Sequence, residues 1–260
     1  MNKRLTSIFA AAFFMLLPLL GWGQAKVYTK RVLLEDFPVR TTKVVLAGQS
    51  FLDMTLRDEV ASRWRVSPYE FCSVEEYENQ KKNNSYYFLR MVLKDGIVFL
   101  DLSKGGDPEV EDRMKRPVDV VSIPISQADV MSGDEIVYMG AFLDIIQKFT
   151  EEAIISDKVG YIGLTSFNGR SMKGKDVYLD EETAREKYQD AQENAVIGIC
   201  IYPEDISTRS KCFRMLITAD TNELYYYNED RYRGPSDRSF TDKEIKSFNG
   251  RHAITHRQIP

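Results

Sequence analysis

Residues 42–66, TKVVLAGQSFLDMTLRDEVASRWRV, contain the pattern on which the fold depends. Lys43–Ala47 is rich in β-branched and apolar residues, which is typical of a buried strand. Ser50 stands three residues before Asp53, the spacing of a helix N-terminal cap, and Pro68 lies beyond the end of the helical pattern. The apolar face of this helix carries a residue at every fourth position, namely Leu52, Leu56, Val60 and Trp64. The stretch therefore predicts a strand followed by an amphipathic helix.

The same alternation continues downstream. A short aromatic strand is predicted at Tyr69–Cys72, and Ser73 with Glu76 repeats the capping signature before a short charged helix. Two runs rich in β-forming residues, Tyr86–Leu93 and Ile97–Leu102, flank an Asp-Gly pair that favours a tight hairpin turn. The first half is thus expected to contain, in order, strand, helix, strand, helix and two strands.

The middle of the chain adds a strand and a long helix. The polar, acidic stretch 105–117 predicts an exposed loop, and Val118–Ile125 predicts the next strand. Ser132–Glu135 opens the longest helical pattern, whose apolar positions run as far as Ile155. This helix is expected to close the core of a first domain.

The second half repeats the opening order. A short strand is predicted at Val177–Leu179, a capped helix at Asp180–Gln192 and a strand at Ala195–Tyr202. Two more strands, Phe213–Thr218 and Leu224–Tyr227, form a predicted β-hairpin. Strand, helix and strand in this order suggest a shortened repeat of the first half.

The first residues have the layout of a secretory signal peptide. Two cations precede an apolar run, Ile8–Leu20, which is too short to span a bilayer comfortably. Small residues at Gly21 and Gly23 favour cleavage before Gln24. The first cysteine is Cys72, far from this position, so no lipid anchor is predicted. The protein is expected to be periplasmic or secreted.

Charge and hydropathy limit the partners. Removal of the signal peptide takes away two of the 35 basic residues and none of the 39 acidic ones, so the mature chain is net negative. This balance argues against nonspecific nucleic-acid binding. No later stretch reaches the roughly 18 apolar residues of a membrane helix, so no membrane insertion is expected after cleavage.

These patterns predict a fold of the α/β to α+β class. Residues 1–23 form the signal peptide, and residues 24–157 form a domain with helices packed on a mixed sheet. Residues 158–260 form a smaller α+β domain with the C-terminal β-hairpin and a mobile tail.

The three cysteines allow two interpretations. Cys200 and Cys212 lie in neighbouring predicted strands, where they would form either a disulfide or two buried thiols. Cys72 lies in an aromatic strand, which favours burial over a role as a nucleophile. Three cysteines do not form a disulfide scaffold.

Three motifs suggest ligand sites but lack the required context. Gly169–Lys175 has the glycine and lysine spacing of a phosphate loop, yet Asp176 and a strand follow it, so a basic surface turn is predicted. His252 and His256 lie in a tail without a helix signal or nearby metal ligands. An acidic loop lacks the ordered spacing of a calcium site and carries Asp107, Glu109, Glu111 and Asp112. No metal site and no cofactor is predicted.

Tyrosines of the last hairpin are the candidate binding residues. Their rings offer a stacking surface for a glycan or a peptide. Alternation along the strand buries at least one of them, and an ordinary sheet face is the other interpretation. The candidates are Tyr225, Tyr226, Tyr227 and Tyr232.

Four stretches, 42–46, 62–71, 173–179 and 219–226, resemble an uncharacterised family of exported bacterial proteins of Bacteroidetes type. The resemblance extends over most of the mature chain. It implies export, and it brings no activity, substrate or catalytic residue.

Three functions agree with these features. The first is a noncatalytic binding or assembly module of the cell envelope, which contacts an envelope protein, a glycan or a second copy of itself through sheet edges or the aromatic hairpin. The second is a carboxylate-based hydrolase acting on a cell-wall or glycan substrate, which requires two acidic side chains in a cleft. The third is a small-ligand binder at the crevice between the two domains.

Overall fold

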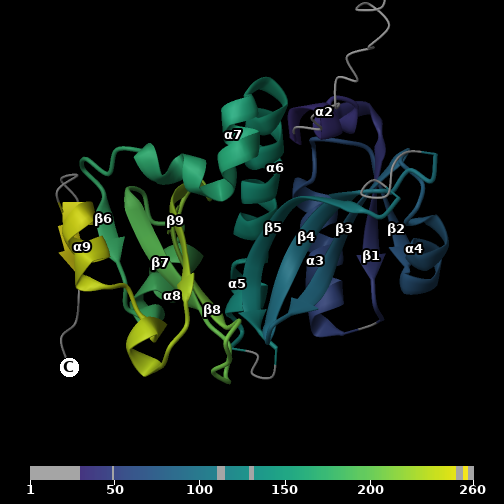
Figure 1. Cartoon of the computed structure of the whole chain (residues 1–260). Helices are drawn as coiled ribbons and strands as arrows, with labels where there is room; N and C mark the ends of the chain where they lie inside the picture. Colours follow the sequence, from purple (N-terminus) through teal and green to yellow (C-terminus); the bar gives the residue numbers. More distant parts are fainter. Residues whose placement is uncertain (1–29, 49, 110–114, 129–131, 250–253, 257–260) are drawn as a thin grey trace, which may run out of the picture.

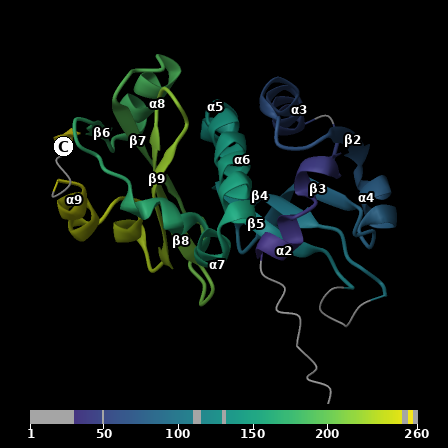
Figure 2. The same ribbon diagram turned by 90° about the horizontal axis from the view of Figure 1, so that it is seen from above.

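The computed structural model describes residues 30–48, 50–109, 115–128, 132–249 and 254–256. It contains two five-stranded mixed sheets, and helix α6 (Met139–Ile155) lies between them (Figures 1 and 2). This confirms the predicted α+β class with two sheet-containing parts.

The first sheet has the strand order β2-β1-β3-β4-β5. Strand β1 is parallel to both β2 and β3, and β3, β4 and β5 form an antiparallel meander. Helices α2 (Lys30–Leu34), α3 (Phe51–Arg63) and α6 pack on one face, and α4 (Val74–Gln80) packs on the other. The strands are β1 (Thr41–Leu46), β2 (Tyr69–Ser73), β3 (Tyr86–Lys94), β4 (Ile97–Lys104) and β5 (Val118–Gln127).

The predicted helix caps are confirmed. Ser50 Oγ accepts a hydrogen bond from the backbone N of Asp53 at 3.1 Å, and the Asp53 carboxylate accepts one from the backbone N of Ala47 at 3.1 Å. Ser73 and Glu76 form both bonds of a capping box at the start of α4. These short-range bonds fix the two strand-to-helix turns of the first sheet.

The prediction of one long helix from residue 132 to residue 155 is wrong in two respects. The chain forms two helices, α5 (Asp134–Val137) and α6, which are separated at Tyr138 with φ −97° and ψ 5°. The Tyr138 ring is buried and contacts the ring of Tyr188 at a centroid distance of 4.8 Å. Ile155, one of the predicted apolar positions, is 76% exposed. The break brings an aromatic ring into contact with the second half of the chain.

The segment that follows α6 is helical. Ser156 ends α6 and caps α7 (Asp157–Ile162), and the 3₁₀ helix η3 (Gly163–Gly169) follows. The predicted domain boundary between residues 157 and 158 thus falls inside α7.

The second sheet has the strand order β10-β6-β7-β8-β9. Strand β6 is parallel to β10 and β7, and β7, β8 and β9 form an antiparallel meander. This is the pairing pattern of the first sheet, with β10 in the place of β2. The strands are β6 (Asp176–Tyr178), β7 (Ala195–Ile201), β8 (Lys211–Thr218), β9 (Leu224–Arg231) and β10 (Ile254–His256).

The shared order agrees with the predicted shortened repeat, although β10 was not predicted and comes from the end of the chain. Helix α8 (Glu181–Gln189) packs on the face toward the first sheet, and α9 (Asp242–Asn249) packs on the opposite face after the 3₁₀ helix η4 (Pro235–Arg238). The structure thus gives each sheet helices on both faces.

One large apolar core extends through both sheets and includes most of α6. A ring contact between Phe99 of β4 and Phe213 of β8, with centroids 5.4 Å apart, joins the two sheets directly. Smaller clusters lie under α4 and under α9. In the described part of the chain, no helix combines the length and the apolar character needed to cross a bilayer.

Candidate functional site

A cavity of about 350 Å³ lies where the turn between β8 and β9 approaches α3 and α6. We call it the crevice. Its apolar lining consists of Val66, Ile145, Phe167 and Leu224. Its polar and charged lining consists of Arg63, Arg65, Asp144, Gln147, Lys148, Glu151, Thr221, Asn222 and Glu223. Both sheet-containing parts therefore contribute walls to one cavity.

Asp144 of α6 ties the walls of the crevice together. Its carboxylate accepts hydrogen bonds from Arg63 Nη1 at 3.1 Å and from Asn222 Nδ2 at 2.6 Å. Asn222 has φ +57°, a left-handed conformation that asparagine tolerates and that shapes the β8–β9 turn. One carboxylate thus links α3, α6 and the hairpin turn.

A second link crosses the same junction. Arg170 forms ion pairs with Glu152 of α6 at 3.5 Å and with Glu223 of the turn at 3.4 Å. Arg170 belongs to the stretch with phosphate-loop spacing. Its guanidinium is therefore occupied by carboxylates of the protein itself. The strand predicted after this stretch is present as β6.

The charges of the crevice are mixed. Three cations and three carboxylates line it, and Arg63 contacts both Asp144 and Glu59. Burial lowers the pKa of Arg63, but the hydrogen bond and charge of Glu59 and the charge of Asp144 outweigh burial and raise it. The crevice therefore offers a ligand donors and acceptors beside an apolar surface.

The comparisons with known proteins assign no function. No family model, no curated protein and no solved structure matches this chain. Membership in an exported bacterial family stays a prediction, and the geometry of the site carries the functional inference.

The hydrolase prediction requires two carboxyl groups in a cleft, one of them with a raised pKa. Among the described carboxyl groups, burial raises the pKa of Asp101 and Asp134. Neither lines the crevice or a second cavity of about 460 Å³ beside Lys211 and Glu229. The hydrolase function therefore stays a prediction.

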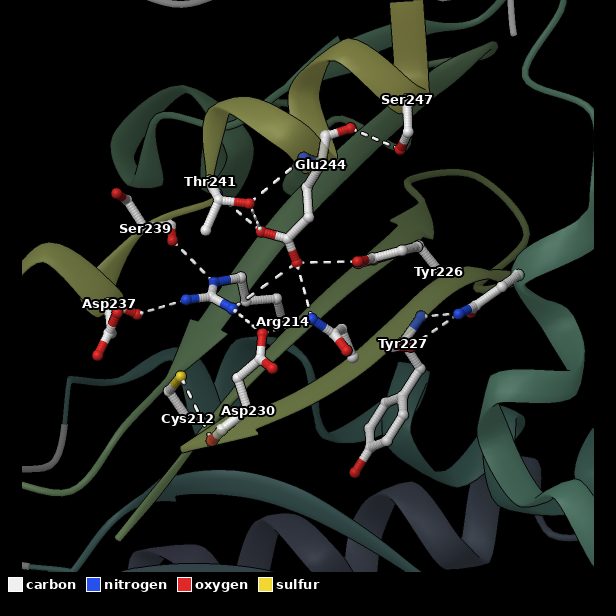
Figure 3. A network of polar contacts seen from close by, with 12 residues as sticks. Cys212, Arg214, Tyr226, Tyr227, Asp230, Asp237, Ser239, Thr241, Glu244 and Ser247 are labelled. Carbon is white, nitrogen blue, oxygen red and sulfur yellow. Dashed lines mark hydrogen bonds and ion pairs between the residues drawn. The ribbon is translucent and has the colours of Figure 1, made fainter. Parts of the chain in front are cut away.

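The predicted tyrosines do not share one surface. Tyr226 and Tyr227 point to opposite faces of the second sheet (Figure 3). Tyr226 Oη donates a hydrogen bond to Glu244 Oε1 at 2.8 Å, whereas the Tyr227 ring is buried in the large core. The backbone N and O of Tyr227 bond to the side-chain amide of Asn168 at 2.8 and 2.9 Å. This amide occupies the outer edge of β9.

Tyr225 and Tyr232 lie apart from that pair. The Tyr225 ring is half-buried, with the cations of Arg170 and Lys175 each 5.9 Å from its centroid. Tyr232 is 1% exposed and stacks on Tyr202 with centroids 5.8 Å apart. Only Tyr225 and Tyr226 therefore keep partly exposed rings.

All three cysteines are free thiols. Arg214, and not Cys212, lies opposite Cys200 in the pairing of β7 with β8. Burial raises the pKa of Cys200 to about 12 and that of Cys72 to about 11. These thiols are protonated at neutral pH and are weak nucleophiles.

The sequence analysis missed a polar network on the outer face of the second sheet. Arg214, 1% exposed, donates to the backbone O of Ser239 at 2.8 Å, to the backbone O of Asp237 at 3.1 Å and to Asp230 Oδ2 at 3.1 Å (Figure 3). Glu244 of α9 lies 3.7 Å from the same guanidinium. A single arginine in an apolar strand was the only signal. The network holds the C-terminal segment on the sheet.

The remaining candidates are the two histidines and the acidic loop, and several of them lie outside the described residues. His252, Glu111 and Asp112 lie outside the described residues, as does the signal peptide, and the side chain of His256 is also not described. Asp107 accepts a hydrogen bond from Asn84. The described part of the chain contains no group of three or more His, Cys, Asp or Glu residues arranged to hold a metal ion.

Proposed function

We propose that this protein is a noncatalytic binding protein that takes a small ligand in the crevice. The observation that carries the proposal is one cavity lined jointly by α3, α6 and the β8–β9 turn. Its volume of about 350 Å³ lies within the range of roughly 300–1,000 Å³ typical of small-molecule sites. The predicted signal peptide supports a role in the envelope or outside the cell.

The lining favours a ligand with an apolar group and a carboxylate. Lys148 Nζ lies 3.9 Å from Glu151 and 3.8 Å from Glu152, too far for hydrogen bonds. Its donors can therefore bind an anionic group at the rim. Phe167 and Leu224 offer apolar contact beside it.

Calorimetry on the protein without residues 1–23 tests this proposal, with acetate, phenylalanine and dipeptides as probes. We expect a probe that combines a carboxylate with an apolar side chain to bind more tightly than acetate. Lys148→Ala should weaken that binding about tenfold, because a charge-assisted hydrogen bond is lost. Lys158→Ala, on the exposed face of α7, is the matched control. Absence of binding by every probe, or equal binding by the Lys148 variant, would contradict the proposal.

A second function, association with a protein partner or a second copy, is favoured by exposed apolar residues beside edge strand β2. Phe51 and Met54 are 66% and 52% exposed, and their i, i+3 spacing places them on one face of α3. Val74, 44% exposed, follows directly after β2. Light scattering across a concentration series tests self-association, which the double variant Phe51→Ser and Met54→Ser should reduce.

A further inference from the structure

A polar row crosses the face of the first sheet on which α4 packs. Arg90 of β3 is paired with Asp101 of β4, and Asp101 is paired with Ser122 of β5. Ser103 lies two residues beyond Asp101 on the same face. Asp101 and Ser103 are completely buried. Polar side chains from three adjacent strands thus lie next to one another on this face of the sheet.

Three atoms of this row lack hydrogen-bond partners among the described residues. They are one donor, one hydroxyl group and one carboxylate oxygen. Buried polar atoms are nearly always bonded to protein or to an ordered molecule, so such a group of atoms indicates a missing partner. The atoms are Arg90 Nε, Asp101 Oδ2 and Ser103 Oγ.

Flexible charged side chains form the rim of the row. Lys94 Nζ lies 3.5 Å from Asp101 Oδ1 and 3.7 Å from Asp119 Oδ2, and Arg90 Nη2 lies 3.8 Å from Asp101 Oδ2. The side chain of Lys94 is 40% exposed and that of Asp119 is 61% exposed. Movement of long, solvent-facing side chains would therefore open the row to a ligand.

The electrostatics agree with this geometry. Burial, followed by the charge of Asp119, raises the pKa of Asp101. The cation of Lys94, a hydrogen bond with Ser122 and the cation of Arg90 only partly offset these two effects. The Tyr77 ring of α4 lies 4.8 Å from the Arg90 guanidinium and covers it from above the sheet. The carboxylate thus lies where the protein alone solvates it poorly.

We propose that this row binds the hydroxyl groups of a saccharide, at a site separate from the crevice. A ligand hydroxyl donates one hydrogen bond and accepts others, so it can serve Asp101 and Arg90 together. A phosphate or carboxylate ligand would meet the negative charges of Asp101 and Asp119. An ammonium ligand would meet the positive charges of Arg90 and Lys94. A neutral, hydroxyl-rich ligand can bind beside both the carboxylates and the cations without charge repulsion.

NMR titration of the ¹⁵N-labelled protein without residues 1–23 tests the proposal, with N-acetylglucosamine, mannose and inorganic phosphate as probes. We expect a saccharide to shift the Arg90 Nε–H signal in a saturable manner. Ser103→Ala should weaken this binding at least tenfold, because it removes a hydroxyl that contacts the ligand. The Ser103 variant should fold, since the hydroxyl has no hydrogen-bond partner within the described protein.

Ser62→Ala, on the exposed side of α3, is the matched control and should bind like the parent protein. A thermal melt of each variant checks folding. A shift with phosphate alone would overturn the ligand class. Absence of any shift would overturn the site and assign ordered water to the row.

Discussion

The two sheets have the same strand order but complete their outer faces differently. Asp101 on β4 and Arg214 on β8 hold equivalent places, each buried on the middle strand of a meander. Main-chain carbonyls of Asp237 and Ser239 satisfy Arg214, whereas Asp101 Oδ2 has no hydrogen-bond partner among the described residues. A shared topology therefore determines where a polar side chain lies, and a covering segment determines whether its hydrogen bonds are made.

The edge strands differ in a related way. In the first sheet β2 lies between α3 and α4 in the chain, whereas in the second sheet β10 comes from the C-terminal end. The segment before β10 also supplies the partners of Arg214. The second sheet therefore depends on its tail for both its edge and its outer face.

The largest expected effect comes from removal of the buried guanidinium. Arg214→Met leaves the buried carboxylate of Glu244 without its cation and the carbonyl of Ser239 without its donor. We expect the free energy of unfolding to fall by about 3–5 kcal/mol, as when one partner of a buried pair is removed. Urea unfolding measures it. Arg209→Ala, at an exposed position, should change it by less than about 0.5 kcal/mol. Equal effects would show that the network does not hold the tail.

A smaller loss is expected at the edge of the same sheet. Asn168→Ala removes the amide that pairs with both backbone groups of Tyr227. Two bonds of this kind are together worth about 1–3 kcal/mol. Urea unfolding gives the loss, and hydrogen exchange at the Tyr227 amide should accelerate. Unchanged exchange would show that the edge is protected by other groups.

The pH dependence should have opposite signs in the two sheets. Burial raises the pKa of Glu244, but hydrogen bonds from Thr241, Tyr226 and Asn228 outweigh it and lower the pKa below its ordinary 4.5. Its stabilising contribution is therefore present above that value and is lost as the pH falls through the folded-state pKa.

The pKa of Asp101 is raised above its ordinary 3.8, so its contribution to stability falls as the pH rises from there to the folded-state pKa. Each proton changes the slope by at most about 1.4 kcal/mol per pH unit. We expect the curve of unfolding free energy against pH, measured from pH 3 to 7, to lose its rising part in Glu244→Gln. The same curve should lose its falling part in Asp101→Asn. The same slope in both variants would remove the contrast between the sheets.

The smallest effect is a gain. Ser103→Ala removes a buried hydroxyl oxygen without a described hydrogen-bond partner, so stability should rise by about 1 kcal/mol and the Tm by about 2–4 °C. Differential scanning calorimetry measures the change. A lower Tm would mean that the hydroxyl already has a partner, such as an ordered water.

The sequence predicted a crevice between the two parts of the chain, but it did not predict which residues line that crevice. The order of elements indicated two parts with a junction between them, and the last β-hairpin was predicted. Asp144 and Lys148 carried no local signal, because charged residues on the polar side of an amphipathic helix are expected to face solvent. The partners of Asp144 are Arg63 and Asn222, far away along the chain.

Tyr225–Tyr227 show the same limit at shorter range. Alternation along the strand correctly predicts burial of at least one ring. A register shift between Leu216 and Ile217, with Leu224 opposite Ile217 and Tyr226 opposite Leu216, leaves Tyr225 as an extra residue. No feature of the local pattern predicts this bulge, because it depends on pairing with β8.

The sequence by itself determined the elements whose signals act over a few residues. The caps at Ser50, Ser73 and Asp180 and the Asp95-Gly96 turn lie where they were predicted, since each depends on a bond or a backbone angle within four residues. The tertiary structure alone decided the break at Tyr138, the strand β10, the crevice and the polar row. These features arise from contacts between distant segments, and burial and hydrogen bonding between such segments exist only once both sheets have formed.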